Sequence, residues 1–228
     1  MTRFLASALF IVLLLGARGA DAQVGHTPEQ SPYVDLIYRH EVTTFSGYLD
    51  TRRDPAGVAP RSAPLVGVRY ALWLAGPASF TARVAYGRTE RRVLDPLEPV
   101  DERVVIPAAN VSLLLADAGV ALSLTGFKSW NRLVPEVNGG VGLVSDFRTK
   151  ADVGGFSFGT RFALTLGAGV RYVPGGRFQL RVDLTDNLYR IAYPDSYYGA
   201  AIVEPDQPKA IWTHNPALTL GVSYLFGR

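Results

Sequence analysis

The sequence has no cysteine, a single methionine and only three histidines among its 228 residues. Without cysteine the chain can form no disulfide, no thiolate metal site, no cysteine nucleophile and no lipid-modified cysteine. The histidines, aspartates and glutamates show no spacing typical of a transition-metal or calcium site, so we expect no metal and no cofactor.

Charge is also sparse. Charged residues make up 19% of the chain, and the formal net charge is +3. The lysines and arginines are scattered among acidic residues and form no dense basic run, which argues against a nucleic-acid partner.

Long apolar runs are scarce, and the clearest one, Phe4 to Leu15, follows Arg3 and precedes the small residues Ala20-Asp21-Ala22. This is the pattern of a secretory signal peptide, here residues 1–22. A membrane-anchoring helix is the alternative, but the run is shorter than the roughly 20 residues that a spanning helix needs. We therefore expect an exported chain in which residues 23–228 form one domain.

The nearest later apolar stretch, Val111 to Leu124, is interrupted by Asp117 and is too short to cross a bilayer as a helix. An exported chain without a spanning helix is a periplasmic protein, a secreted protein or a β-barrel.

The sequence is rich in glycine, tyrosine and phenylalanine, and it alternates repeatedly between apolar and polar residues. From Arg161 to Tyr172, apolar side chains occupy the even positions, while charged, small or polar ones dominate the odd positions. A turn at Pro174 to Arg177 follows, and the alternation resumes from Phe178 to Thr185. A period of two predicts a β-hairpin with one apolar face and one charged face.

The alternation recurs along the chain and predicts about eight strands, at 34–47, 62–75, 78–92, 104–125, 133–147, 159–173, 177–190 and 214–226. Short turns alternate with longer polar loops, and this asymmetry with an even strand count is typical of small membrane barrels. Pro107 opposes pairing at the start of the 104–125 segment, and a turn at Ala116 to Gly119 is an alternative that would change the count.

Periodicity leaves two compartments open. In a soluble lipocalin-type carrier the apolar face points inward, whereas in a membrane barrel it faces lipid and the charged face lines the interior. Tyr172 and Phe178 flank the turn, where a membrane barrel places its interfacial aromatic residues. Their position favours the membrane barrel.

The last predicted strand carries a second indication, in the order Thr219, Gly221, Tyr224 and Phe226. This order resembles the C-terminal signal by which the barrel-assembly machinery recognises outer-membrane proteins. It departs from that signal in one respect, because two further residues follow the final aromatic residue.

The whole mature chain resembles the superfamily of small outer-membrane barrels that includes outer-membrane proteins A and W and the opacity-type proteins. The motifs that carry the resemblance are Leu133-Val134-Pro135-Glu136-Val137 leading to Gly139-Gly140-Val141-Gly142, then Gly167-Ala168-Gly169-Val170-Arg171-Tyr172, then Leu180-Arg181-Val182-Asp183. The resemblance implies an all-β chain, a single antiparallel transmembrane β-barrel surrounded by outer-membrane lipid and inserted by the barrel-assembly machinery. Such motifs mark the fold and not the activity.

The polar face of the predicted barrel collects a set of charged residues: Asp35, Arg39, Glu41, Arg69, Arg83, Glu136, Arg161, Arg171, Arg181 and Asp183. An eight-stranded barrel is just wide enough for side chains to fill, and buried charges must be paired. We therefore predict an interior salt-bridge network that holds the barrel closed. A gated ion path or a catalytic carboxylate pair is the alternative.

The segment 191–213 is the longest predicted outer loop. It contains the aromatic and aliphatic residues Tyr193, Tyr197, Tyr198, Ile202, Val203 and Trp212. An exposed aromatic loop can bind a surface partner, whereas Tyr193 and Trp212 are equally compatible with an interfacial girdle. His214 follows Asp195 and Ser196 near the same rim, which permits a hydrolase set but also an interfacial histidine beside a polar loop.

We therefore predict a non-enzymatic outer-membrane barrel that serves envelope structure or surface interaction. A narrow channel for small or hydrophobic solutes, a lipid-A-modifying enzyme and a soluble periplasmic carrier are the alternatives.

Overall fold

The computed structural model describes residues 31–51, 54, 57–91, 93–96, 105–106, 110–147, 151–199 and 208–227. The predicted signal peptide at residues 1–22 lies outside the described residues. So do Pro107, Ile202 and Val203.

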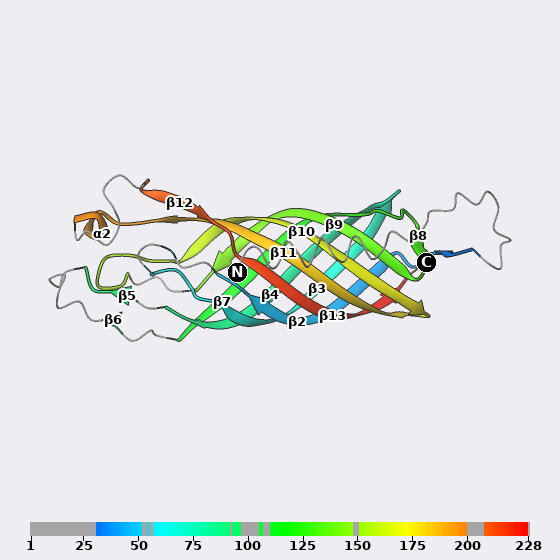
Figure 1. Ribbon diagram of the computed structural model, residues 1–228, viewed down its shortest axis with the longest axis horizontal. Helices are drawn as coiled ribbons and strands as arrows, with labels where there is room; N and C mark the ends of the chain where they lie inside the picture. Colours follow the sequence, from blue (N-terminus) through cyan, green and yellow to red (C-terminus); the bar gives the residue numbers. More distant parts are fainter. Residues whose placement is uncertain are drawn as a thin grey trace, which may run out of the picture. The chain divides into compact units, whose positions relative to one another are not determined.

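Eight antiparallel strands close into a barrel (Figure 1). They are β2 (His40–Leu49), β3 (Ala63–Ala75), β4 (Ala78–Glu90), β7 (Asn110–Ser123), β9 (Leu133–Ser145), β10 (Thr160–Gly175), β11 (Phe178–Ala192) and β13 (Pro216–Phe226). Each strand pairs with the next in this order, and the ring closes where β13 pairs with β2. The predicted antiparallel barrel of about eight strands is confirmed. Among the described residues, no helix is long and apolar enough to cross a membrane.

Two strand predictions need correction. The segment 34–47 is not one strand, because β1 (Tyr33–Asp35) pairs with β8 (Lys128–Trp130) outside the ring and β2 begins only at His40. The segment 104–125 contains two separate strands. Val105 and Ile106 form β6, which pairs with β5 (Val93–Leu94), and β7 then runs without a turn through Ala116 to Gly119.

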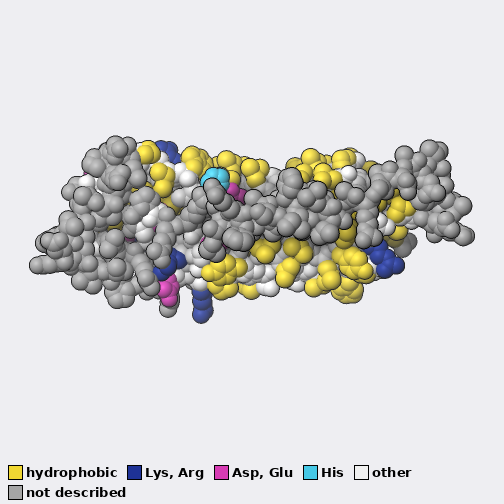
Figure 2. All heavy atoms as spheres, in the orientation of Figure 1, with side chains coloured by type: hydrophobic (Ala, Val, Ile, Leu, Met, Phe, Trp, Pro, Cys, Tyr) yellow, Lys and Arg dark blue, Asp and Glu magenta, His cyan; other side chains and the backbone are white. Residues whose placement is uncertain are grey.

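The wall of the barrel is apolar outside, and its inward-facing side chains are charged or polar toward one end and apolar toward the other. Along β10 and β11 the even positions that alternation predicted as one face are exposed on the outer surface, for example Leu166 at 61% and Leu180 at 53%. The odd positions, such as Arg171 and Arg181, are buried in the interior. Figure 2 shows hydrophobic side chains gathered on the outside of the wall. A soluble carrier would show the reverse, so the lipocalin-type alternative does not fit.

The two ends of the barrel differ in their connections. One end, here called the turn end, has the short connections and the start of β2 and end of β13. One of its hairpins joins β8 to β9 through Asn131 and Arg132, whose φ values of 48° and 66° are those of a type I′ turn. The other end, here called the loop end, has the long connections. In Figure 1 it lies on the left, with α2 (Asp195–Gly199) and β12 (Ala210–Thr213).

Candidate functional site: the closed lumen

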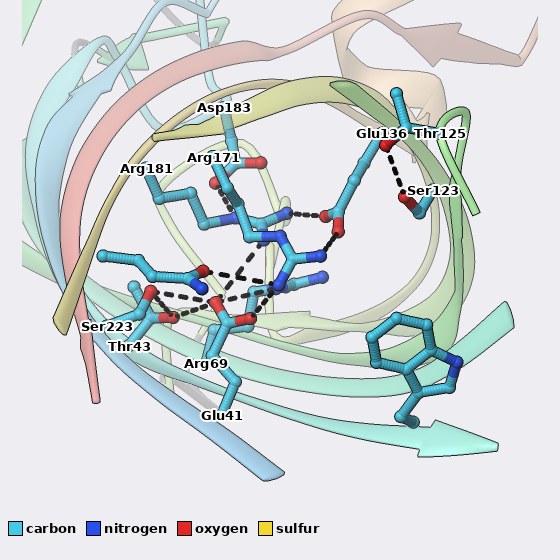
Figure 3. Close-up of polar contacts among 12 residues, drawn as sticks. Glu41, Thr43, Arg69, Ser123, Thr125, Glu136, Arg171, Arg181, Asp183 and Ser223 are labelled. Carbon is cyan, nitrogen blue, oxygen red and sulfur yellow. Dashed lines mark hydrogen bonds and ion pairs between the residues drawn. The ribbon is translucent and has the colours of Figure 1, made fainter. Parts of the chain in front are cut away.

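Four charged side chains form a closed ring across the lumen near the turn end (Figure 3). Glu41 on β2 and Glu136 on β9 lie four strands apart in the eight-stranded ring, and therefore on opposite walls. Arg171 bridges them, with Nη1 3.0 Å from Glu41 and Nη2 2.7 Å from Glu136. Arg181 bridges them a second time, with distances of 3.5 Å to Glu41 and 2.8 Å to Glu136. We call these four residues the charged ring.

Further groups complete the ring. Asp183 accepts a hydrogen bond from Arg181 Nε, and Arg69 lies 3.9 Å from Glu41. Thr43 and Ser223 both donate to Glu41 Oε1, at 3.0 and 2.8 Å. The ring and its neighbours thus contain three carboxylates and three guanidinium groups, and buried charges of opposite sign compensate one another only when they are paired in this way.

The local backbone makes room for these side chains. Gly169 on β10 lies beside the Asp183 carboxylate, and a Cβ at this position would clash with Asp183 Oδ1. Inward-facing glycines in a narrow barrel therefore provide the volume that long charged side chains occupy.

The structure brings six of the ten predicted interior charges to this place: Glu41, Arg69, Glu136, Arg171, Arg181 and Asp183. It corrects the prediction for Asp35 and Arg39, which lie outside the lumen. Asp35 belongs to β1 and pairs with Lys128 at 3.7 Å, with a side chain that is 73% exposed. Arg39 is exposed just before β2 begins. Both residues lie outside because the chain joins the barrel only at His40.

A second polar level crosses the lumen nearer its middle. Arg83 on β4 donates to Asp117 on the adjacent β7 and to Asn187 on the opposite β11, both at 2.7 Å. Arg83 and Arg69 both line a small cavity of about 30 Å³. A space of this size is sufficient for one or two water molecules and much too small for a solute.

The half of the lumen toward the loop end is apolar. Its inward-facing residues include Leu49, Leu65, Leu113, Leu115, Val144, Ala163, Tyr189 and Ile191, all of them buried in one cluster. Loop residues fold over this cluster from above, among them Val58, Phe156 and Phe158, which are at most 2% exposed. Arg161 reaches the same region and donates to the backbone carbonyls of Ser157 and Phe158 instead of joining the charged ring.

Three loops are tied together over this cluster by a set of residues that we call the cap: Asp54, Val58, Arg91, Asp152, Phe156, Tyr193 and Tyr197. Arg91 is its centre, because Nε donates to the Val58 carbonyl at 2.6 Å and Nη2 contacts the Asp152 carboxylate at 3.0 Å. The same guanidinium lies 5.1 Å from the centroid of the Phe156 ring. Asp152 accepts in turn from the backbone amide of Phe156 at 2.9 Å.

Two tyrosines from the predicted loop 191–213 complete the cap. Tyr193 donates to Asp54 at 3.0 Å, and Tyr197 donates to Asp152 at 3.4 Å. Burial raises the pKa of both phenols, and the neighbouring carboxylates of Asp54 and Asp152 raise it further. The tyrosines are therefore part of an ordered core, whereas Trp212 is 52% exposed on the outer wall.

Sequence reasoning missed the cap and Asp117. Asp54 and Asp152 lie in loops without periodicity, and each accepts from backbone amides up to five residues later in the chain. An aspartate followed by glycine within three residues, as in both loops, is a turn signal that points to such local bonding. Asp117 was visible as a lone charge in an apolar strand, and such a charge needs a partner.

The hydrolase set that the sequence left open as an alternative is not assembled. His214 Nδ1 lies 2.6 Å from Asp186, Asp195 pairs with Lys209 at 2.8 Å, and Ser196 donates to the Gly154 carbonyl. Each candidate therefore has a different partner. Among the described residues, no group of three or more histidine, aspartate or glutamate side chains is arranged to hold a metal ion.

The four residues of the predicted assembly signal lie on β13 with two orientations. Thr219 is buried, facing inward with Gly221, while Tyr224 and Phe226 lie on the outer surface at the turn end. Tyr224 accepts a hydrogen bond from Arg177, and Phe226 stacks on His40 across the seam between β13 and β2. Their recognition by the assembly machinery stays a prediction.

An apolar outer wall around a charged interior is the arrangement of a protein whose surrounding solvent is lipid, so the chain is a transmembrane β-barrel. No family model and no curated protein matches the sequence. The crystal structure of the outer membrane protein OprG from Pseudomonas aeruginosa matches with a TM-score of 0.51 at 13% identity, over 85% of this chain and 99% of that one. The crystal structure of Neisserial surface protein A matches with a TM-score of 0.50 at 14% identity, over 82% and 97%.

The chain therefore has the fold of the small outer-membrane β-barrels, and its place is the outer membrane of a Gram-negative envelope. By the usual asymmetry of such barrels, the turn end faces the periplasm and the loop end faces outward.

Proposed function

We propose that this protein is a closed, non-enzymatic barrel that anchors an ordered surface on the outside of the cell. The observation that carries the proposal is the occupied lumen. Ion pairs cross it at the charged ring, a hydrogen bond from Arg83 to Asn187 crosses it nearer the middle, and apolar side chains fill its outer half.

A channel function fits this lumen poorly. An ion passing the charged ring would have to separate Arg171 and Arg181 from Glu41 and Glu136, and each separation leaves an uncompensated buried charge. The same ion would then meet the mainly aliphatic and aromatic side chains of the apolar cluster, which cannot replace its hydration shell. The two halves of the lumen thus oppose conduction for different reasons.

The cap supports a role on the outer surface. Arg91, Tyr193 and Tyr197 hold loops that come from distant parts of the sequence in one arrangement. Ordered loops lose less conformational entropy on binding than free ones, so a partner would find a preorganised surface. Phe147 and Val153, which are 64% and 50% exposed near the cap, offer apolar contacts for such a partner.

Planar-bilayer recording tests the closed lumen. Folded wild-type protein, checked by the change of its gel mobility on heating, is expected to give no single-channel currents. Uptake of small sugars and amino acids into proteoliposomes is expected to equal that of protein-free vesicles. Reproducible currents or solute uptake by the folded wild type would refute the proposal and favour a narrow channel.

Mass spectrometry of lipid A tests the enzymatic alternative. We expect the same lipid A species from membranes that contain the wild type and from membranes that contain a His214→Ala variant. A modified species present only with the wild type would show lipid-A-modifying activity and overturn the non-enzymatic assignment.

A further inference from the structure

Two hydroxyl side chains interrupt the apolar outer wall. On β2 the outward-facing residues are Val42, Thr44, Ser46 and Tyr48, and both Thr44 and Ser46 are exposed. They are the fifth and seventh residues of a ten-residue strand, and a spanning strand of about 9–11 residues places such positions near the middle of the bilayer.

Their neighbours on both sides are apolar. Thr44 pairs with Val68 on β3 and with Val222 on β13, and Ser46 pairs with Val66 and Leu220 on the same two strands. Val84, Ala118, Val141 and Leu166 are apolar outward-facing residues on other strands. Asp186, the cross-strand partner of Leu166, is polar but is bonded to His214 and to the Asn215 amide.

Neither hydroxyl has a hydrogen-bond partner among the described residues, and the small side chains leave a hollow in the wall. A groove of about 540 Å³ runs over β2, β13 and β11, lined by Thr44, Ser46, Leu180, Val182, Leu220 and Val222. Gly221, between Leu220 and Val222, also lines the groove, and a Cβ at this position would clash with Thr43 on the inner side of the wall.

Lipid is a poor occupant for this groove. The middle of the bilayer contains no water, and acyl chains neither donate nor accept hydrogen bonds, so both hydroxyls would remain unsatisfied there. A protein surface that offers hydroxyls at the same depth would satisfy them. Small residues with hydroxyl groups are also what allows two membrane segments to approach closely.

We propose that a second copy of this chain docks here, so that the barrel forms a twofold dimer in the plane of the membrane. A twofold axis along the membrane normal keeps every residue at its own depth, and therefore brings Thr44 toward Thr44 and Ser46 toward Ser46 of the other copy. A hydroxyl both donates and accepts, so each pair is self-complementary. The proposal concerns the outer wall and does not depend on whether the lumen conducts.

Disulfide trapping tests the dimer, and the natural absence of cysteine provides a clean background. Leu220→Cys introduces a thiol beside the groove without removing either hydroxyl. Val141→Cys is the matched control, because Val141 is 53% exposed against 60% for Leu220 but lies on β9, which is opposite β2 in the ring and away from the groove. Oxidation in native outer membranes is expected to crosslink the Leu220→Cys protein and to leave the Val141→Cys protein monomeric.

The hydroxyls are tested by adding Thr44→Val and Ser46→Ala to both cysteine variants. Loss of two hydrogen bonds between membrane-spanning segments is expected to weaken association of the two copies about tenfold. Correct folding is checked by heat-modifiable gel mobility in every variant. Equal crosslinking at both cysteines, no crosslinking at either, or unchanged crosslinking after the hydroxyls are removed would each overturn the proposal and leave lipid as the occupant.

Discussion

The two halves of the lumen are closed by opposite chemistry. Toward the periplasm, long charged side chains meet across the ring at distances of 2.7–3.5 Å. Toward the outside, the same barrel wall points leucines, a tyrosine and an isoleucine inward, as a water-soluble domain does. Near the turn end the strands place charged side chains inside and apolar ones outside. Toward the loop end the same strands place apolar side chains inside, and the loops cover this apolar core.

This difference predicts different responses to damage. The charged ring depends on every member, because removing one partner leaves the others buried and unpaired. The cap depends on local packing and hydrogen bonds, so its loss opens the loops and spares the barrel.

Removing Arg181 gives the largest expected effect. Arg181→Ala withdraws contacts from Glu41, Glu136 and Asp183, and breaking a buried ion pair in this way costs about 3–5 kcal/mol. The free energy of unfolding is measured by urea titration in lipid vesicles. Arg177→Ala, in an exposed turn, serves as the control and should leave the midpoint unchanged; equal losses in the two variants would show that the ring does not stabilise the barrel.

Removing Arg91 tests the cap. Arg91→Ala breaks its bonds to Val58 and Asp152, and hydrogen bonds of a charged group contribute about 1.5–3 kcal/mol each. We expect faster amide hydrogen exchange at Val58 and Phe156, with unchanged exchange in β9 and β10. Uniformly faster exchange throughout the barrel would contradict the separation of the two halves.

A methyl group at Gly169 tests how tightly the ring is packed. Gly169→Ala forces Asp183 away from its position, and overpacking of this kind costs about 1–3 kcal/mol. Gly139→Ala is the matched control on the neighbouring strand, because its Cβ would meet nothing nearer than 3.4 Å. The urea midpoints of the two variants are compared. A Gly139→Ala variant as unstable as Gly169→Ala would refute the packing argument.

Alkaline pH is expected to act on the cap alone and to give the smallest effect. The pKa values of Tyr193 and Tyr197 are raised above the ordinary 10.0, so the unfolded loops lose these protons first as the pH rises. Stability of the cap is therefore complete below pH 10 and falls above it. In the wild type, amide exchange at Phe156 is expected to accelerate above pH 10. In Tyr197→Phe, the part of this acceleration that comes from ionisation of Tyr197 should be absent.

Much of the half of the lumen toward the turn end could be predicted from the alternation of apolar and polar residues alone. In a strand the side chains take opposite faces in turn, so one correct assignment such as Glu136 fixes the orientation of its neighbours. The same rule failed for Asp35. Asp35 has the odd numbering of the inward-facing residues on β2, but β2 begins only at His40. Alternation describes a strand and does not say where the strand starts.

The cap was beyond reach for a different reason. Asp54, Arg91 and Asp152 come from three separate loops, and their contacts depend on how those loops cross in space. The outward-facing Thr44 and Ser46 were in plain view in the sequence. Their significance required the register, which shows that their neighbours on both adjacent strands are apolar.

The hydrogen bonds of Glu41 also have a consequence for the order of assembly. Glu41 lies on the first strand of the barrel and Ser223 on the last, and they meet only across the seam where β13 joins β2. Arg171 and Arg181 likewise approach Glu41 only when the ring of strands is complete. In an open, partly inserted sheet Glu41 would lack these partners, whereas Arg171 and Arg181 would keep Glu136 and Asp183. Closure of the seam is therefore the step that neutralises Glu41.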